Sequence, residues 1–194
     1  HGGHYILKPG MSNRELITML RGGLQTPVKV SFVKERLPED LAGTIARQIE
    51  VDSLSILKLL RDEDFLKKHG LDENTLLSFF IPNTYEFYWN ISAETFIEKM
   101  LKQHTSFWEN NGRKQKAEIA GLTQLEVSVI ASIVEEESAK EDERPRIAGL
   151  YLNRIKKGMK LQADPTIKFA LKRFDLRRIL YRHLDAAADS PYST

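Results

Sequence analysis

The strongest structural signal in this sequence is an amphipathic helix directly after Thr123. Thr123 and Glu126 have the spacing of a capping box, in which two side chains satisfy backbone N–H groups at a helix start. The residues that follow at intervals of three and four share one helical face: Val127, Ile130, Ile133, Val134 and Glu137. This face has to pack against other elements, so we expect a mostly helical core around it.

Glu137 is the one carboxylate on that otherwise apolar face. A carboxylate beside apolar side chains loses hydration, which disfavours its charged form and raises its pKa. A raised pKa suits a general acid near neutral pH. Glu135 and Glu136 point away from the face and are predicted to be more exposed. The alternative is that Glu137 is an edge residue that pairs with Lys or Arg and has no chemical role.

Two more helices are predicted after this one. The first begins near Asp142 and ends at Gly158, and its inner face would consist of Ile147, Leu150, Tyr151 and Ile155. The second covers Ile167 to Leu171. Asp164 is predicted to cap it through its side chain, and Pro165 takes the first helical position. We expect Arg144 and Arg154 to pair with Glu141 or Glu143 on the surface.

The first half of the chain mixes strand and helix signals. Helices are predicted after the capping box at Ser12, from Pro38, from Asp52 or Ser53, and from Ser92. Strands are predicted at 5–7, at 28–33 and within 81–89, and residues 109–116 are predicted to be a loop or a frayed helix end. In the third strand Tyr85, Phe87 and Trp89 alternate with polar residues. They indicate either a core strand or aromatic side chains that line a carbohydrate groove.

Composition excludes several function classes. The net charge of +2 gives no reason to expect a nucleic-acid partner. The absence of cysteine removes disulfides, thiolate catalysis and Cys-based zinc sites. His1 and His4 are weak evidence for a metal, so we assign neither a metal nor a cofactor. No apolar run is long enough to span a bilayer. Because the chain begins at His1 rather than Met, we expect an excised fragment with any membrane anchor upstream.

Several motifs, taken together, resemble the endolytic murein transglycosylases of the YceG-like family. The segments that match closely are IPNTYEF, ASIVEEES and ERPRIAGLYLNRIKKGMKLQADPT. The match extends loosely to HL and SPYST near the end of the chain. GHYILKPGMSNRELITMLRGG is similar to the small LysM-like subdomain of the family. Phe169 stands where many members carry Tyr, and Ser193 where many carry Asn.

The resemblance implies an α+β fold and a set of site residues. It assigns residues 1–36 to a partial LysM-like α/β subdomain and residues 37–194 to a mostly helical catalytic domain that is truncated at its C-terminus. Glu137 matches the second Glu of the VExE pattern, which is the catalytic one in the family. Asn153, Gln162, Asp164 and Thr166 match residues of the substrate cleft.

The resemblance also implies a reaction. Members cleave the β-1,4 bond between N-acetylmuramic acid and N-acetylglucosamine in peptidoglycan glycan strands and leave 1,6-anhydro ends. One carboxylate suffices, because the C6 hydroxyl of the substrate is an intramolecular nucleophile. No cofactor is implied. The implied partners are glycan strands and cell-wall synthesis proteins. The implied location is the bacterial plasma membrane, with the catalytic part facing the periplasm or the outside.

Two other functions remain open from the sequence. The chain is alternatively a non-catalytic peptidoglycan-binding or scaffold protein, which has no use for a desolvated acid at Glu137. It is alternatively a lysozyme-like hydrolase, which needs a second carboxylate. Asp164 is the motif candidate for that second carboxylate, and its structural alternative is the helix cap described above.

Overall fold

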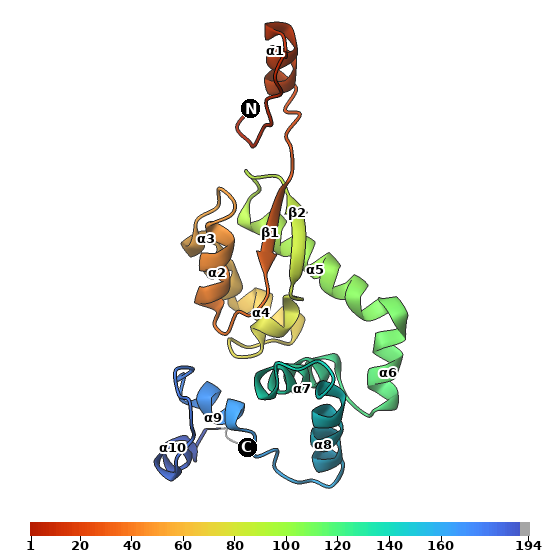
Figure 1. Ribbon diagram of the computed structural model, residues 1–194, viewed down its shortest axis with the longest axis vertical. Coiled ribbons are helices and arrows are strands. Elements are labelled where there is room, and N and C mark those ends of the chain that lie inside the picture. Colours follow the sequence, from red (N-terminus) through yellow and green to blue (C-terminus); the bar gives the residue numbers. More distant parts are fainter. Residues whose placement is uncertain (191–194) are drawn as a thin grey trace. The chain divides into compact units, whose positions relative to one another are not determined.

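The computed structural model describes residues 1–190 and divides the chain into two compact units, His1–Lys116 and Ala117–Thr194 (Figure 1). The fold is α+β, mostly helical, with one small two-stranded sheet. This confirms the α+β, mostly helical part of the predicted fold class, and the LysM-like subdomain stays a prediction. The predicted boundary at residue 36 concerns the subdomains of the family, and it differs from the division between these two units.

The first unit contains the sheet and the larger of the two cores. Its elements are α1 (Asn13–Arg21), β1 (Val28–Phe32), α2 (Pro38–Ala46), α3 (Ser53–Leu60), α4 (Glu63–His69), η1 (Leu76–Phe79), β2 (Asn83–Phe87), α5 (Ala93–Glu109) and η2 (Asn110–Gly112), and α6 (Arg113–Ile119) crosses into the second unit. Side-chain caps at Ser12, Asp52 and Ser92 start α1, α3 and α5, as predicted.

Strands β1 and β2 pair antiparallel, with Val30 opposite Tyr85. Alternate residues of each strand are buried, because successive side chains point to opposite faces of a sheet. The side chain of Gln48 bonds to both the N–H and the C=O of Ser31, at 2.9 Å each, and so satisfies backbone groups of β1 that a third strand would otherwise pair with.

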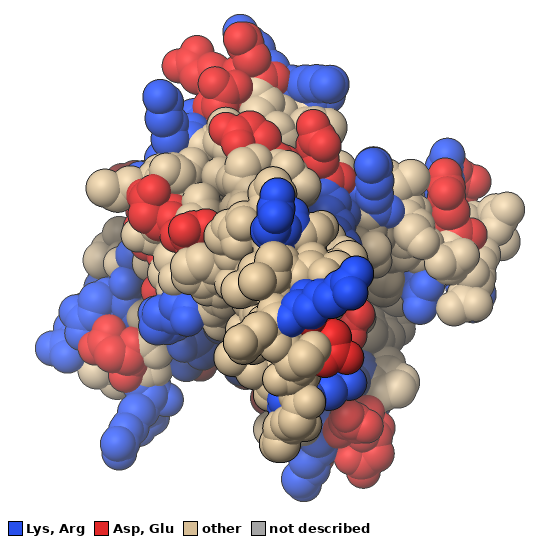
Figure 2. Space-filling model, turned by 90° about the horizontal axis from the view of Figure 1, so that it is seen from above, with Lys and Arg blue, Asp and Glu red and all other residues tan. Residues whose placement is uncertain are grey.

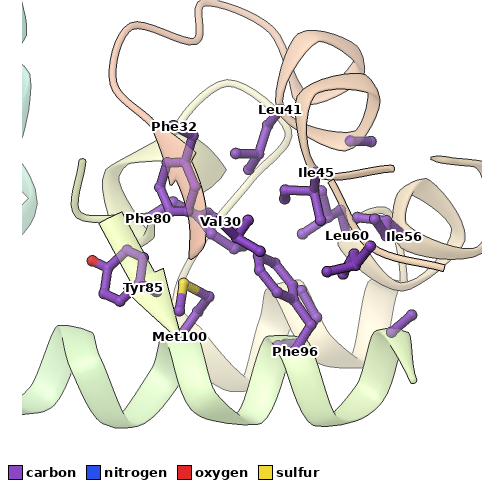
Figure 3. Close-up of a cluster of buried hydrophobic side chains, with 14 of the residues drawn as sticks. Val30, Phe32, Leu41, Ile45, Ile56, Leu60, Phe80, Tyr85, Phe96 and Met100 are labelled. Atoms are coloured by element: carbon purple, nitrogen blue, oxygen red, sulfur yellow. The ribbon is translucent and has the colours of Figure 1, made fainter. Parts of the chain in front are cut away.

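One face of this sheet packs on helices α2, α3 and α5 (Figure 3). The largest fully buried side chains of this core are Val30, Leu41, Ile45, Ile56, Leu60, Leu76, Phe96 and Met100. Tyr85 and Phe87 are buried in the same cluster. Their burial identifies β2 as a core strand in which Tyr85 and Phe87 face the interior rather than an open groove, whereas Trp89 lies beyond the end of the strand and is half-buried.

Two predictions for this unit were wrong. Residues 5–7 form no strand, because the sheet contains only β1 and β2 among the described residues and leaves 5–7 without a ladder partner. Residues 109–116 form neither a loop nor a frayed helix end, since a short helical turn at 110–112 leads directly into α6. Asn111 takes the left-handed conformation in that turn, at φ 57°, which Asn tolerates better than most residues.

The second unit contains α7 (Gln124–Glu137), α8 (Arg144–Lys156), α9 (Asp164–Ala170) and α10 (Tyr181–Ala187). Its core lies between α7, α8 and the start of α9. The buried members are Ile130, Ile133, Val134, Tyr151 and Ala163, and Leu122, Ile147, Ala148, Leu152 and Leu161 pack against them.

The inner face of α8 was predicted only in part. Ile147 and Tyr151 pack in the core, but Leu150 is 54% exposed and Ile155 is 37% exposed. Successive helical residues are about 100° apart, so Leu150 points well away from the centre of a face made by 147, 148, 151 and 152. Ile155 has the right direction but lies one turn beyond the residues that meet α7.

The surface carries charged side chains of both signs (Figure 2). Lys and Arg side chains are interspersed with Asp and Glu over the face in Figure 2, as a net charge of +2 suggests. Among the described residues, no single helix has the length and hydropathy to cross a bilayer, although one pair of helices joined at a sharp bend reaches that length and hydropathy together.

Candidate active site

Helix α7 presents its apolar face as predicted and ends at Glu137. Its capping box is formed: the side-chain hydroxyl of Thr123 accepts from the N–H of Glu126, at 3.2 Å, and Glu126 accepts from the N–H of Thr123, at 2.7 Å. Ile130, Ile133 and Val134 are buried, and Val127 is half-buried. The helix therefore has a fixed rotation about its axis, and this rotation sets the direction of Glu137.

The connection from α7 to α8 is held by its own side chains. The hydroxyl of Ser138 donates to Glu143, at 2.6 Å, and accepts from the N–H of Lys140, at 3.1 Å. The ammonium of Lys140 also donates to Glu143, at 3.2 Å. These bonds close the connection into a defined turn, so that the chain re-enters a helix that packs against α7.

Tyr151, in the middle of α8, meets Glu137. Its side chain is 5% exposed, and its hydroxyl donates a 2.9 Å hydrogen bond to Oε1 of Glu137. Burial raises the pKa of Tyr151 to about 12, with further contributions from the hydrogen bond to Glu137 and from its charge. The phenol is therefore protonated, and remains a donor, across the physiological pH range.

Arg154 and Gln162 form the next part of the site. Arg154 donates from Nε to the C=O of Lys160, at 2.7 Å, and from its terminal nitrogen to the side-chain oxygen of Gln162, at 2.5 Å. The predicted pairing of Arg154 with Glu141 or Glu143 is therefore wrong, because the loop after α8 folds back within reach of its guanidinium. Gln162 is exposed and has a left-handed backbone, at φ 54°.

Asp164 is not the predicted cap of α9. The N-cap is Ala163, and no side chain makes a capping hydrogen bond there. Asp164 is instead the first helical residue, because α9 begins one residue earlier than expected and takes Pro165 into its second position. Its charge raises the pKa of Tyr151, while the charge of Arg154 lowers it.

The remaining predicted site residues lie on α8 and α9. The hydroxyl of Thr166 donates to the C=O of Ala163, at 2.7 Å, and its side chain is half-buried. Asn153 is exposed on α8, two residues after Tyr151. This spacing turns it roughly 200° around the helix from Tyr151, so it does not face the phenol.

The predicted order of exposure among the three glutamates was wrong. Glu137 and Glu136 are both exposed, and Glu135 is half-buried. The reason is the position of the helix end: α7 stops at Glu137, so no further turn of its own helix covers that side chain. The neighbour that engages Glu137 is Tyr151, from α8.

The end of α7 carries an unfavourable charge pattern. Glu135, Glu136 and Glu137 follow one another in the last turn, which contains no basic residue. The C-terminus of a helix carries partial negative charge, so cations are favoured there and carboxylates are not. This pattern indicates that these carboxylates serve something other than helix stability.

Sequence reasoning missed Tyr151 and Arg154 as members of the site. Tyr151 was predicted only as a core residue, and Arg154 as a surface partner. One signal was available for Tyr151: it is the only residue of the predicted inner face of α8 with a polar end, and a buried tyrosine hydroxyl usually finds a hydrogen-bond partner.

No cluster of three or more potential metal ligands of the His, Cys, Asp or Glu type is present within residues 1–190. The ring of His4 instead lies 3.1 Å from the backbone oxygen of Thr26. Ser193 and the rest of the SPYST motif after Ser190 lie outside the described residues.

Comparisons with known proteins identify the family and several relatives of this chain. Residues 1–194 match the YceG-like family. The chain is 30% identical to an endolytic murein transglycosylase of Bacillus subtilis (strain 168), over 99% of this chain and 56% of that protein. It is 27% identical to an endolytic murein transglycosylase of Streptococcus pneumoniae (serotype 2, strain D39 / NCTC 7466), over 98% of this chain and 39% of that protein.

A solved structure supports the fold. The crystal structure of a YceG-like protein from Listeria monocytogenes superposes with a TM-score of 0.72 at 23% identity, covering 96% of this chain and 66% of that one. The chain thus spans about half the length, or less, of the curated relatives that it matches.

Proposed function

The chain belongs to the YceG-like family, and from this membership we propose that it carries the catalytic site of an endolytic lytic transglycosylase. The proposed substrate is the peptidoglycan glycan strand, cut at the β-1,4 bond between N-acetylmuramic acid and N-acetylglucosamine. The names of the relatives from Bacillus subtilis and Streptococcus pneumoniae support murein as the substrate and transglycosylation as the reaction.

The observation that carries the proposal is the contact between Glu137 and Tyr151. Glu137 is an exposed carboxyl group whose partner is a neutral phenol. An exposed carboxyl group can reach a substrate, and a neutral donor orients it without neutralising it as Lys or Arg would. This arrangement suits one carboxyl group that acts first as an acid and then as a base.

The proposed reaction needs only that group. Glu137 protonates the glycosidic oxygen as the bond from C1 of N-acetylmuramic acid to that oxygen breaks. The C6 hydroxyl of the same sugar then attacks C1, and the Glu137 carboxylate takes its proton as the 1,6-anhydro ring closes. Protons balance, and water is not consumed. The attack is intramolecular, so it gains a large effective concentration.

We propose that Asn153, Gln162, Asp164 and Thr166 bind the sugar chain and its acetamido groups. Gln162 supports this role through its geometry. Its side-chain oxygen accepts from Arg154, which orients the amide NH₂ group of an exposed residue as a donor. Because Arg154 already restricts the Gln162 side chain, its amide loses little conformational entropy when it binds a sugar hydroxyl or carbonyl group.

We also propose a domain organisation and a cellular location for the protein. Residues 1–36 correspond to the LysM-like subdomain and residues 37–194 to the catalytic domain. The protein acts in the bacterial cell envelope, anchored in the plasma membrane by a segment upstream of His1. It works beside cell-wall synthesis proteins.

A hydrolase is the second candidate, and one observation favours it. Glu137 accepts a hydrogen bond from Tyr151, and the charge of Asp164 raises the pKa of the same phenol. A hydrolase of the lysozyme type uses two carboxyl groups, one of them to activate water or attack the sugar. A glycan-binding protein without turnover is the third candidate.

Digestion of purified glycan strands by the full-length protein separates these three. The proposal predicts products with 1,6-anhydro ends, which are lighter than reducing ends by one water. Reducing ends identify a hydrolase instead. Strands that remain intact under conditions in which the protein binds them identify a binding protein.

A further inference from the structure

We propose that Tyr151 is a positioning residue for Glu137: its hydroxyl holds Oε1, and leaves Oε2 as the oxygen that gives the proton to the substrate and takes it back. The inference rests on the proposed function, because it assigns Tyr151 a role relative to the acid–base reaction of Glu137. Tyr151 is not among the residues that the family motifs place in the substrate cleft.

The two side chains differ in how firmly they are held. The ring of Tyr151 is buried in the core that Ile130, Ile133 and Val134 form on α7. Glu137 is exposed at the end of α7, and Tyr151 is the hydrogen-bond donor on its carboxyl group within the described residues. An exposed glutamate otherwise samples several rotamers, so the rigid phenol restricts the carboxyl group to one direction.

The phenol can fill this role in both halves of the reaction. Its pKa of about 12 keeps it protonated at physiological pH. It donates to a carboxylate oxygen when Glu137 is charged, and to the carbonyl oxygen of the carboxyl group when Glu137 is protonated at Oε2. It therefore never competes for the transferred proton, and Oε1 stays engaged while Oε2 changes state.

The position of Tyr151 also connects the acid to the proposed substrate-binding segment. Asp164 raises its pKa and Arg154 lowers it, so both groups lie within electrostatic reach of the phenol. Arg154 in turn holds Gln162. Tyr151 therefore holds Glu137 from the same helix, α8, whose Arg154 braces Gln162.

The test is steady-state kinetics of Tyr151→Phe in the full-length protein on purified glycan strands. Phenylalanine keeps the ring in the core and removes only the donor. We expect kcat to fall roughly 10- to 100-fold, the cost of a misplaced catalytic group, while KM is unchanged. Tyr181→Phe is the matched control, because Tyr181 lies on α10 at 86% exposure. It should have wild-type kcat and KM.

A double-mutant cycle separates positioning from a structural role. Aspartate at position 137 is shorter by one methylene and cannot reach the phenol in the same way. Adding Tyr151→Phe to Glu137→Asp should therefore lower kcat much less than it does in the wild type. An equal loss in both backgrounds means that Tyr151 acts through stability alone, and overturns the inference.

A second substitution tests the inference even if Tyr151→Phe does not fold. Fluorotyrosine incorporated at position 151 keeps the ring and the hydroxyl but has a more acidic phenol. The alkaline loss of kcat reports deprotonation of the general acid, and it should begin at a lower pH than in the wild type, because a more acidic phenol donates a stronger hydrogen bond and favours the Glu137 carboxylate over the protonated acid. An unshifted alkaline limb overturns the inference.

Failure of this inference and failure of the proposed function give different results. An inactive Glu137→Gln together with a Tyr151→Phe variant of wild-type kcat overturns the role of Tyr151 and leaves the function standing. An active Glu137→Gln overturns the proposed acid itself, and with it the role of Tyr151.

Discussion

Tyr151 and Glu137 are 14 residues apart in the sequence, and the hydroxyl of the first lies 2.9 Å from Oε1 of the second. The contact joins a buried ring on α8 to an exposed carboxyl group at the end of α7. The packing of two helices and the turn between them therefore sets the direction of the group that we propose to be the acid.

The pKa of Tyr151 is sensitive to its contact with Glu137 and can be measured without an activity assay. Glu137→Gln removes a charge and a charged acceptor that both raise the pKa of the phenol, although burial, the largest cause, remains. We expect the pKa of Tyr151 to lie below about 12 in this variant and above the ordinary value of about 10. Tyrosine NMR with ring carbon labels measures it, and Tyr151→Phe assigns the signal. An unchanged pKa would mean that the contact is absent in solution.

His104 makes the first unit sensitive to acid. Its Nε2 accepts a 3.1 Å hydrogen bond from the indole N–H of Trp108, which requires that this nitrogen carry no proton. Its ring also stacks on Phe79, with centroids 4.2 Å apart. Burial, and then the nearby His69, lower the pKa of His104 from 6.5. The folded state therefore favours the neutral ring.

The sign of the pH dependence follows from that direction. Below pH 6.5 the unfolded chain binds a proton at His104 before the folded chain does, so the free energy of unfolding decreases as the pH falls toward the folded pKa. Urea unfolding followed by tryptophan fluorescence measures it, since both tryptophans, Trp89 and Trp108, lie in the first unit. His104→Gln keeps an acceptor for Trp108 and should weaken the dependence between pH 7.5 and about 5.5. If the free energy of unfolding depends on pH equally in this variant, another group and not His104 causes the dependence.

Arg154→Lys tests the brace on Gln162. Lysine keeps the charge, but a single ammonium cannot replace the planar guanidinium that bonds to Lys160 and Gln162 together. If Gln162 binds the glycan, KM should rise roughly tenfold, the worth of one hydrogen bond to a charged group, with little change in kcat. Lys156 is an exposed residue on the same helix, so Lys156→Ala is the control and should leave KM unchanged. A fall in kcat at constant KM would instead assign Arg154 to the chemistry at Glu137.

The elements that the sequence predicted well are those with local causes. The buried face of α7, from Val127 to Val134, follows from helical spacing and the capping box at Thr123. The caps of α1, α3 and α5 depend on residues within one turn of each helix start. The same spacing correctly put Glu137 in line with the apolar residues of α7, although it did not predict how exposed the side chain is.

The features that the sequence predicted wrongly depend on other elements. Residues 5–7 have strand composition, but a strand needs a partner, and the sheet leaves them none. The exposure of Glu135 relative to Glu137 depends on where α7 ends and on what packs beside it. Tyr151 reaches Glu137 only because α8 packs against α7, and no local sequence pattern predicts that packing. Asp164 does not cap α9, because the helix begins one residue earlier than predicted.

The central claim is that Glu137 is the acid and base of the reaction, and the most direct measurement compares Glu137→Gln with Glu136→Gln in the full-length protein. Both remove one carboxylate from the exposed end of α7. We expect Glu137→Gln to lose at least 10⁴-fold in kcat, at or beyond the upper end for general acid–base assistance, because the same group acts twice. It should still bind glycan strands and melt at or slightly above the wild-type temperature. Glu136→Gln should release anhydro products at the wild-type rate. An inactive Glu136→Gln beside a fully active Glu137→Gln, or two fully active variants, would contradict the account.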